Sequence, residues 1–227
     1  PEGRSAALVQ VEAALAIDPD YPEAHGVAAW CYFARSLWEG GLQQQNADGA
    51  RRHAEAVRAS RTDDATTLAY AAIAYAFATR ELAPALEMID RAIARNPSSM
   101  HAHAHGAVIN TWAGDYPRSI ALGERALRLS PFDPFAVMAW AGMAGARLMR
   151  GEHGLAIAAA GRALELYPSH VPSHLIRIAA LVREHRLDEA RAAAARLMAL
   201  APGYRIAQPI PIMHHFVAEF RQAGLPD

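Results

Sequence analysis

Histidines are the side chains of this sequence best suited to chemistry, and the chain has eleven of them. His101 and His105 are four residues apart, so on a helix they share one face, where such a pair can hold a metal ion. The same spacing recurs at His170 and His174. Zinc needs a third and usually a fourth ligand, and no Cys, Asp or Glu lies in the turn from His101 to His105. We predict no metal site and no cofactor. Partly exposed or hydrogen-bonded histidines are expected, some titrating near neutral pH, with a metal or small-ligand sensor as the alternative.

Sequence motifs of enzyme active sites are missing. The chain contains no Gly-rich phosphate loop, no HExxH and no serine elbow. Asp63 and Asp64 form an acidic pair, which we interpret as a helix cap because carboxylates favour helix N-termini. Arg51, Arg52 and Arg58 are interpreted as a solvated outer face. The chain itself is therefore predicted not to be an enzyme.

The composition favours a helical protein. Of 227 residues, 52% are hydrophobic, 20% are charged and 7% are aromatic, and the chain is rich in alanine, the best helix former. A net charge of −1 argues against nucleic acid as a partner, because a nucleic-acid binder needs a basic face. No stretch approaches the roughly 18 apolar residues of a membrane helix. A single cysteine, Cys31, suits a reducing cytoplasm, and the missing initiator Met suggests a piece of a longer protein.

The elements that would position these residues repeat along the chain. A small–apolar residue pair, followed within a few residues by proline, recurs several times. Pro97, Pro131, Pro168 and Pro202 are spaced 34, 37 and 34 residues apart. A period of about 34 residues, with two helices per unit, is typical of tetratricopeptide repeats.

Residues within each unit agree with this period. Gly114 and Gly151 suit the left-handed position that ends a first helix, and Ala126 and Ala163 suit a close crossing of two helices. Proline after the second helix stops it, because proline has no N–H. On these residues the sequence resembles the tetratricopeptide family over nearly its whole length. The resemblance implies an all-α, right-handed superhelical solenoid of antiparallel helix pairs.

The predicted domain is a single superhelix over residues 1–227. A polar insert at 39–46 would lengthen its first full unit, and the last helix would cap the stack. The predicted parts are a partial unit at 4–19, full units at 21–61, 64–97, 99–131, 133–168 and 171–202, and a capping helix at 211–223.

Scattered phrases also resemble a particular group of proteins. They are Ala28–Tyr32, Leu129–Pro134 and the tail Phe220–Asp227. They are similar to the C-terminal tetratricopeptide region of bacterial multidomain signalling proteins, typically class III adenylate or guanylate cyclases; some transcription regulators carry similar tails. This resemblance implies a regulatory region whose catalytic or DNA-binding domain lies upstream.

In this family the first helix of each unit lines a concave groove. Projecting those helices gives an apolar, aromatic wall that suits a peptide or protein partner, or the chain's own upstream domain. It does not suit chaperone C-termini, which need groove lysines, and this chain has no lysine. Burial of the wall against neighbouring helices and pairing into a homodimer are the alternatives. The candidate groove residues are Trp30, Phe33, Tyr70, Phe77, His101, His105, Trp112, Met138 and Met149.

Overall fold

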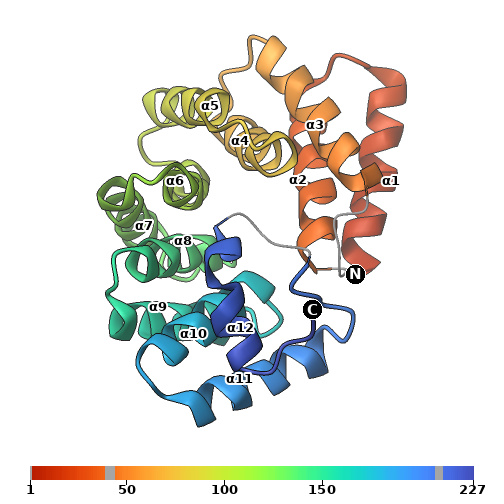
Figure 1. Cartoon of the computed structure of the whole chain (residues 1–227). Coiled ribbons are helices and arrows are strands. Elements are labelled where there is room, and N and C mark those ends of the chain that lie inside the picture. Colours follow the sequence, from red (N-terminus) through yellow and green to blue (C-terminus); the bar gives the residue numbers. More distant parts are fainter. Residues whose placement is uncertain (1, 39–43, 208–211) are drawn as a thin grey trace.

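A computed structural model of the chain describes residues 2–38, 44–207 and 212–227, which are helical apart from their connecting loops (Figure 1). Within these ranges there is one short 3₁₀ helix and no strand. The predicted all-α class is confirmed. In chain order the elements are α1 (Glu2–Ile17), α2 (Pro22–Trp38), α3 (Gln44–Ala59), α4 (Ala65–Thr79), α5 (Leu82–Arg95), α6 (Met100–Ala113), α7 (Tyr116–Leu129), α8 (Ala136–Met149), α9 (His153–Leu166), α10 (Val171–Arg183), α11 (Leu187–Leu200), the 3₁₀ helix η1 (Met213–Phe216) and α12 (Val217–Gln222).

The helices pack as successive pairs that form an arc. The pairs are α2 with α3, α4 with α5, α6 with α7, α8 with α9 and α10 with α11, while α1 packs on α2. The first helix of each pair contacts the first helix of the next, so these helices line the inner side of the arc and their partners cover its outer side (Figure 1). The arc curls far enough for α10 to contact α2. Residues distant in sequence thus meet on the inner side.

Small residues permit the closest helix crossings. A Cβ added to Gly142 on α8 would lie 2.8 Å from the carbonyl carbon of Ala107 on α6, so these two backbones pack directly on each other. The Thr111 hydroxyl donates to the Gly142 carbonyl at 2.9 Å, within the same crossing. Ala126 and Ala163 are 1% and 0% exposed. Larger side chains at these positions would push the helices apart.

The residues that the sequence indicated as helix ends are confirmed. The Asp64 carboxylate accepts a hydrogen bond from the Thr67 backbone N–H at 2.6 Å, which caps α4. Gly114 and Gly151 have φ angles of 84° and 76°, in the left-handed region that glycine adopts without a Cβ penalty. Capping depends on residues within one turn, so the sequence signal survives in the fold.

Three histidines form the same kind of hydrogen bond to the loop that precedes their helix. In each case the imidazole Nε2–H donates to the carbonyl of a proline six residues earlier. Since a carbonyl only accepts, the proton must lie on Nε2 in all three rings. The pairs are His25 with Pro19 at 2.8 Å, His103 with Pro97 at 2.9 Å and His174 with Pro168 at 2.8 Å.

A chain of hydrogen bonds joins two of the histidines on α2 and α3. Because His25 carries its proton on Nε2, its Nδ1 accepts from the Nδ1–H of His53 at 2.8 Å. The other ring nitrogen of His53 accepts from Arg52 at 3.2 Å. Burial, then the nearby Arg52 charge, lowers the pKa of His53 to about 4. The ring is therefore neutral at physiological pH.

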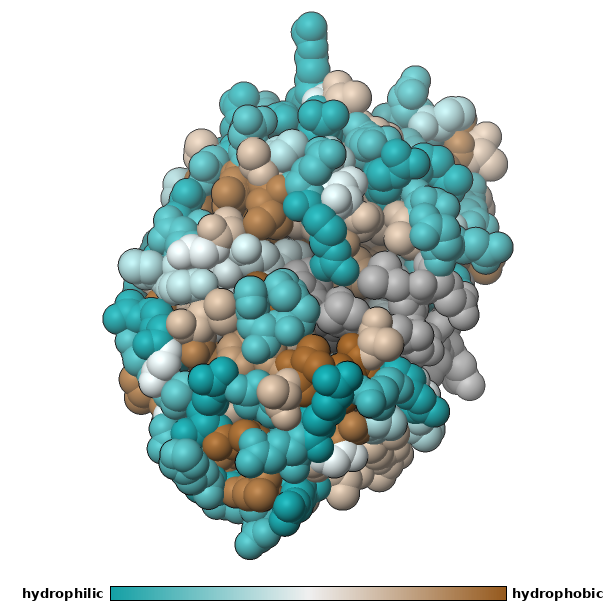
Figure 2. Space-filling model, viewed as in Figure 1, coloured by the Kyte–Doolittle hydropathy of each residue, from teal (hydrophilic) through white to brown (hydrophobic). Residues whose placement is uncertain are grey.

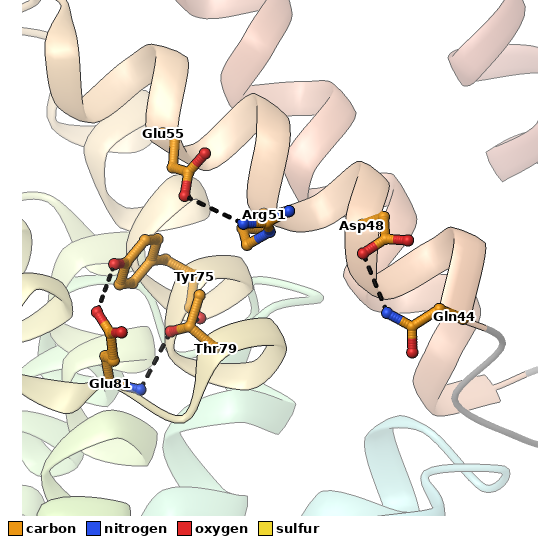
Figure 3. A network of polar contacts seen from close by, with 7 residues as sticks. All are labelled: Gln44, Asp48, Arg51, Glu55, Tyr75, Thr79 and Glu81. Carbon is orange, nitrogen blue, oxygen red and sulfur yellow. Dashed lines mark hydrogen bonds and ion pairs between the residues drawn. The ribbon is translucent and has the colours of Figure 1, made fainter.

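The outer face of α3 carries charges, as predicted for its arginines. Figure 3 shows Gln44 donating to Asp48, and Arg51 paired with Glu55 at 3.9 Å. These contacts hold exposed side chains in place and contribute little stability each. A second group in the same view ties the end of α4: the Tyr75 hydroxyl donates to Glu81 at 2.7 Å (Figure 3).

Two expectations need correction. Residues 39–43 of the predicted polar insert lie outside the described residues, and Gln44–Asn46, also assigned to it, form the first residues of α3. The predicted capping helix at 211–223 is instead a 3₁₀ turn followed by the short helix Val217–Gln222, with residue 211 outside the described ranges. This segment packs on α10 inside the arc, as Figure 1 shows for α12 at the centre of the view. Its apolar side chains are buried in the core around α10.

Candidate functional site

Aromatic rings from three helix pairs meet on the inner side of the arc. Trp30 of α2 stacks on Tyr70 of α4, with ring centroids 5.3 Å apart. Phe135, just before α8, lies 5.1 Å from Trp30 and 4.6 Å from His101 of α6. His105 packs edge-on against Trp30 at 5.1 Å. We call these five residues the aromatic cluster; with Phe135 at the start of α8, it joins the first three pairs to the fourth.

The histidines of the cluster are neutral. His105 is fully buried, and its Nδ1–H donates to the His101 carbonyl at 2.8 Å. Burial, then the proximity of His101, lowers the pKa of His105 to about 3. Burial likewise lowers the pKa of His101. Their rings stack with centroids 6.2 Å apart, and among the described residues no three His, Cys, Asp or Glu side chains gather as metal ligands would.

Three histidines are hydrogen-bonded, as expected, but are not among those that could titrate near neutral pH. The pKa of His170 is lowered to about 3, first by burial and then by His174. His53 and His105 are similarly affected. Sequence spacing could not reveal this, because the shifts come from burial by neighbouring pairs.

The structure divides the candidate groove residues into two groups. Phe33, Phe77, His105 and Met138 are each 2% exposed or less, so a partner cannot reach them without rearrangement. Phe33 packs edge-on against Phe77 at 5.1 Å, as core aromatic side chains commonly do. The half-buried members are Trp30, Tyr70, His101, Trp112 and Met149.

An apolar cavity of about 200 Å³ opens beside the aromatic cluster. It lies where the arc brings α2 near the start of α8 and the end of α9. None of its lining residues is charged, and three of them are aromatic. We call it the anchor cavity, and it is lined by Trp30, Ala34, Pro134, Phe135, Val137, Met138 and Tyr167.

Five of the seven lining residues were not among the candidate groove residues, and three of these five lie outside the first helices of the pairs. Phe135 and Pro134 lie in the loop before α8, and Tyr167 follows α9. Projection of the first helices considered neither loops nor second helices. One local signal was available: Asp133 accepts from the Phe135 N–H at 2.8 Å, which fixes the loop that turns Phe135 inward.

A second, smaller hollow of about 40 Å³ lies between α6, α8 and α10. Trp112 lines it, together with Gly142 and Gly145 of α8. Ile212 and Met213 from the end of the chain form another wall. We call this the inner hollow.

Apolar surface is limited on the face of the molecule that Figure 1 shows. Figure 2 shows that, on the face seen in Figure 1, apolar areas are small and separated by hydrophilic side chains, one of them near the centre. None of the helices in the described ranges combines the length and apolar character that crossing a bilayer requires.

The paired helices and their inner face define a tetratricopeptide-like helical-repeat fold. No family model matches the sequence, and no curated protein matches it. Solved structures share the fold, and the three described next are each at 20% identity or less.

Three of these structures illustrate the likeness. PilW, a widely conserved type IV pilus biogenesis factor, is 18% identical, with a TM-score of 0.61 over 87% of this chain and 86% of its own. The tetratricopeptide protein TTC0263 of Thermus thermophilus is 20% identical, with a TM-score of 0.58 over 70% of this chain and 85% of its own. A chain of the APC/C hetero-tetramer Cut9–Hcn1 is 14% identical, with a TM-score of 0.71 over 98% of this chain and 40% of its own. At such identities the likeness establishes the fold and no partner.

Proposed function

We propose that this chain is a non-catalytic protein-interaction scaffold, and that the anchor cavity receives one apolar side chain of its partner. The tetratricopeptide-like fold supports this proposal, and the cavity is the observation that carries it. Helices from the first pair and from the fourth pair form its walls, so it exists only when the arc is closed. Concave, mostly apolar sites of this kind receive anchor residues of partners.

The chemistry of the walls selects the anchor. Trp30, Phe135 and Tyr167 offer large, rigid apolar faces, and a charged side chain placed among them would lose its hydration without gaining a charged partner. An aliphatic or aromatic side chain would instead remove its own apolar surface from water. We therefore expect a peptide or protein segment with one exposed Leu, Ile, Met or Phe.

The setting of the scaffold follows from the sequence resemblance. We place it in the bacterial cytoplasm, as the C-terminal regulatory region of a signalling protein of the class III cyclase kind. Its partner is then another protein or its own upstream domain. A homodimerisation arm of such a protein, or the tail of a transcription regulator, is the alternative setting.

Filling the anchor cavity tests the proposal. Ala34 is 1% exposed and lines the cavity, so Ala34→Leu should occupy part of its volume while keeping the fold. Twelve-residue peptides selected by phage display against the wild-type chain should share an apolar anchor. We expect Ala34→Leu to weaken their binding at least tenfold in calorimetry.

The matched control is Ala59→Leu, the same change at an exposed position of α3. It should leave peptide affinity unchanged, and thermal melts should show both variants folded. Equal affinity for wild type and a folded Ala34→Leu variant would rule out the anchor cavity as the binding site. A selection that enriches no peptide would count against a peptide-binding function altogether.

A further inference from the structure

The end of the chain lies over the inner hollow, where it places Ile212 and Met213. Met213 is 2% exposed, and both η1 and α12 contact α10. A Cβ added to Gly145 of α8 would lie 3.5 Å from Cδ1 of Ile212. This distance is an ordinary van der Waals contact, so Ile212 lies directly against α8 at Gly145. Two consecutive aliphatic side chains, Ile212 and Met213, occupy the inner face here.

The backbone at this point is unfavourable. Ile212 has a φ angle of 66°, in the left-handed region that β-branched residues rarely adopt. The packing around Ile212 and Met213 is also incomplete, because the inner hollow leaves about 40 Å³ of empty space beside them. Trp112 lines the same space. Strain and unfilled space both weaken this local arrangement.

The following helix and the end of the chain have contacts of their own that do not involve Ile212 or Met213. Glu219 of α12 is 8% exposed and pairs with Arg183 of α10 at 2.5 Å. Phe220 and Leu225 are 1% and 5% exposed within the core around α10 and α11. The Pro226 carbonyl accepts a hydrogen bond from the backbone N–H of Ile206 at 2.9 Å. Because α12 has these contacts of its own, Ile212 and Met213 can leave the hollow while α12 stays in place.

The chain places two neighbouring aliphatic side chains at the inner hollow. We therefore infer that the inner hollow is a second docking site for the partner, an inference that rests on the proposed function. It accepts two consecutive aliphatic side chains of an extended partner peptide, and Ile212 and Met213 occupy it as an internal competitor. A partner segment whose backbone is free of left-handed strain would fill the hollow better than Ile212 and Met213 do. The partner must displace η1 before it binds, which lowers its apparent affinity by the fraction of molecules that are open.

The test adds the chain's own competing segment, as a separate peptide, to the full chain. The probe is a labelled synthetic peptide with the sequence of residues 206–220. In the double variant Ile212→Asp/Met213→Asp, the buried carboxylates should expel η1 and free the hollow. We expect this variant to bind the peptide at least tenfold more tightly than the wild type does. Binding should move the fluorescence of Trp112 to shorter wavelength, and a Trp112→Phe version identifies that signal.

Two controls separate this site from the anchor cavity. A peptide carrying the same two aspartates should not bind, and Ala34→Leu should leave peptide binding unchanged. Loss of binding only with Ala34→Leu would instead place the peptide in the anchor cavity. A folded double variant that binds no better than wild type would overturn the inference, whether or not the selected peptides bind the anchor cavity.

Hydrogen exchange on the wild-type chain provides a second, independent measurement. The His215 amide bonds to the Ile212 carbonyl in η1, and the Ala223 amide bonds to the Glu219 carbonyl at the end of α12. If η1 opens by itself, the His215 amide should exchange at least a hundredfold faster than the Ala223 amide. Equal protection of the two amides would show that the segment opens as one unit, which the inference forbids.

Discussion

Replacing Gly142 with alanine is expected to lower the free energy of unfolding by about 2 to 3 kcal/mol, because the added methyl would overlap the backbone of α6. A Cβ there would lie 2.8 Å from the Ala107 carbonyl carbon and 2.9 Å from the Val108 nitrogen, and neither atom can turn away as a flexible side chain could. The helices would separate. The Thr111 hydroxyl would then lose its close contact with the Gly142 carbonyl.

The matched control is Gly161→Ala in the middle of α9, where an added Cβ meets nothing within 4 Å. Both changes bring the same gain in helix propensity, so the control should raise stability by up to about 1 kcal/mol. Urea unfolding followed by helical circular dichroism measures both variants. A Gly142→Ala protein as stable as Gly161→Ala would show that α6 and α8 do not cross as closely as described.

A steep loss of stability in acid is the second large effect expected. His53, His105 and His170 have pKa values of about 4, 3 and 3 in the folded chain, against 6.5 for each unperturbed side chain. Unfolding below pH 6.5 therefore takes up protons, and the stability that is complete above that pH is lost progressively towards pH 3. Near pH 5 the three groups together give a slope of about 4 kcal/mol per pH unit. Since a domain is stable by only about 5–15 kcal/mol, it should unfold well above pH 3.

The role of His105 in this slope can be isolated. In His105→Phe the ring stays apolar and aromatic, so the pH dependence between about 4 and 6 should fall by about one third. Urea midpoints measured at several pH values provide the comparison. Parallel curves for wild type and His105→Phe would mean that His105 is not buried in its neutral form.

Local features of the fold could be predicted from the sequence because they depend on neighbours within one or two turns. The spacing of Pro97, Pro131 and Pro168 indicated the helix pairs. Gly114 and Asp64 indicated where helices end and begin. The last helix was placed incorrectly because its position depends on packing against α10, a contact between segments distant in sequence.

The candidate site could be predicted only in part. Helical projection selected Trp30 and Met138, which do line the anchor cavity. It could not separate the half-buried Trp30 from Phe77 and Met138, which are each 2% exposed, because all three positions are apolar and recur with the same period. It also missed Tyr167, which reaches the cavity from the end of a second helix.

The sequence by itself determined the class of fold, the helix pairs and their caps, since periodicity and capping are local properties. Only the tertiary structure decided that α2 meets α10, that Phe135 and Tyr167 line the anchor cavity, and that Ile212 lines the inner hollow. The physical reason is that a small angle between neighbouring pairs accumulates along the arc. No single repeat encodes that sum, and it alone brings the first pair against the fourth.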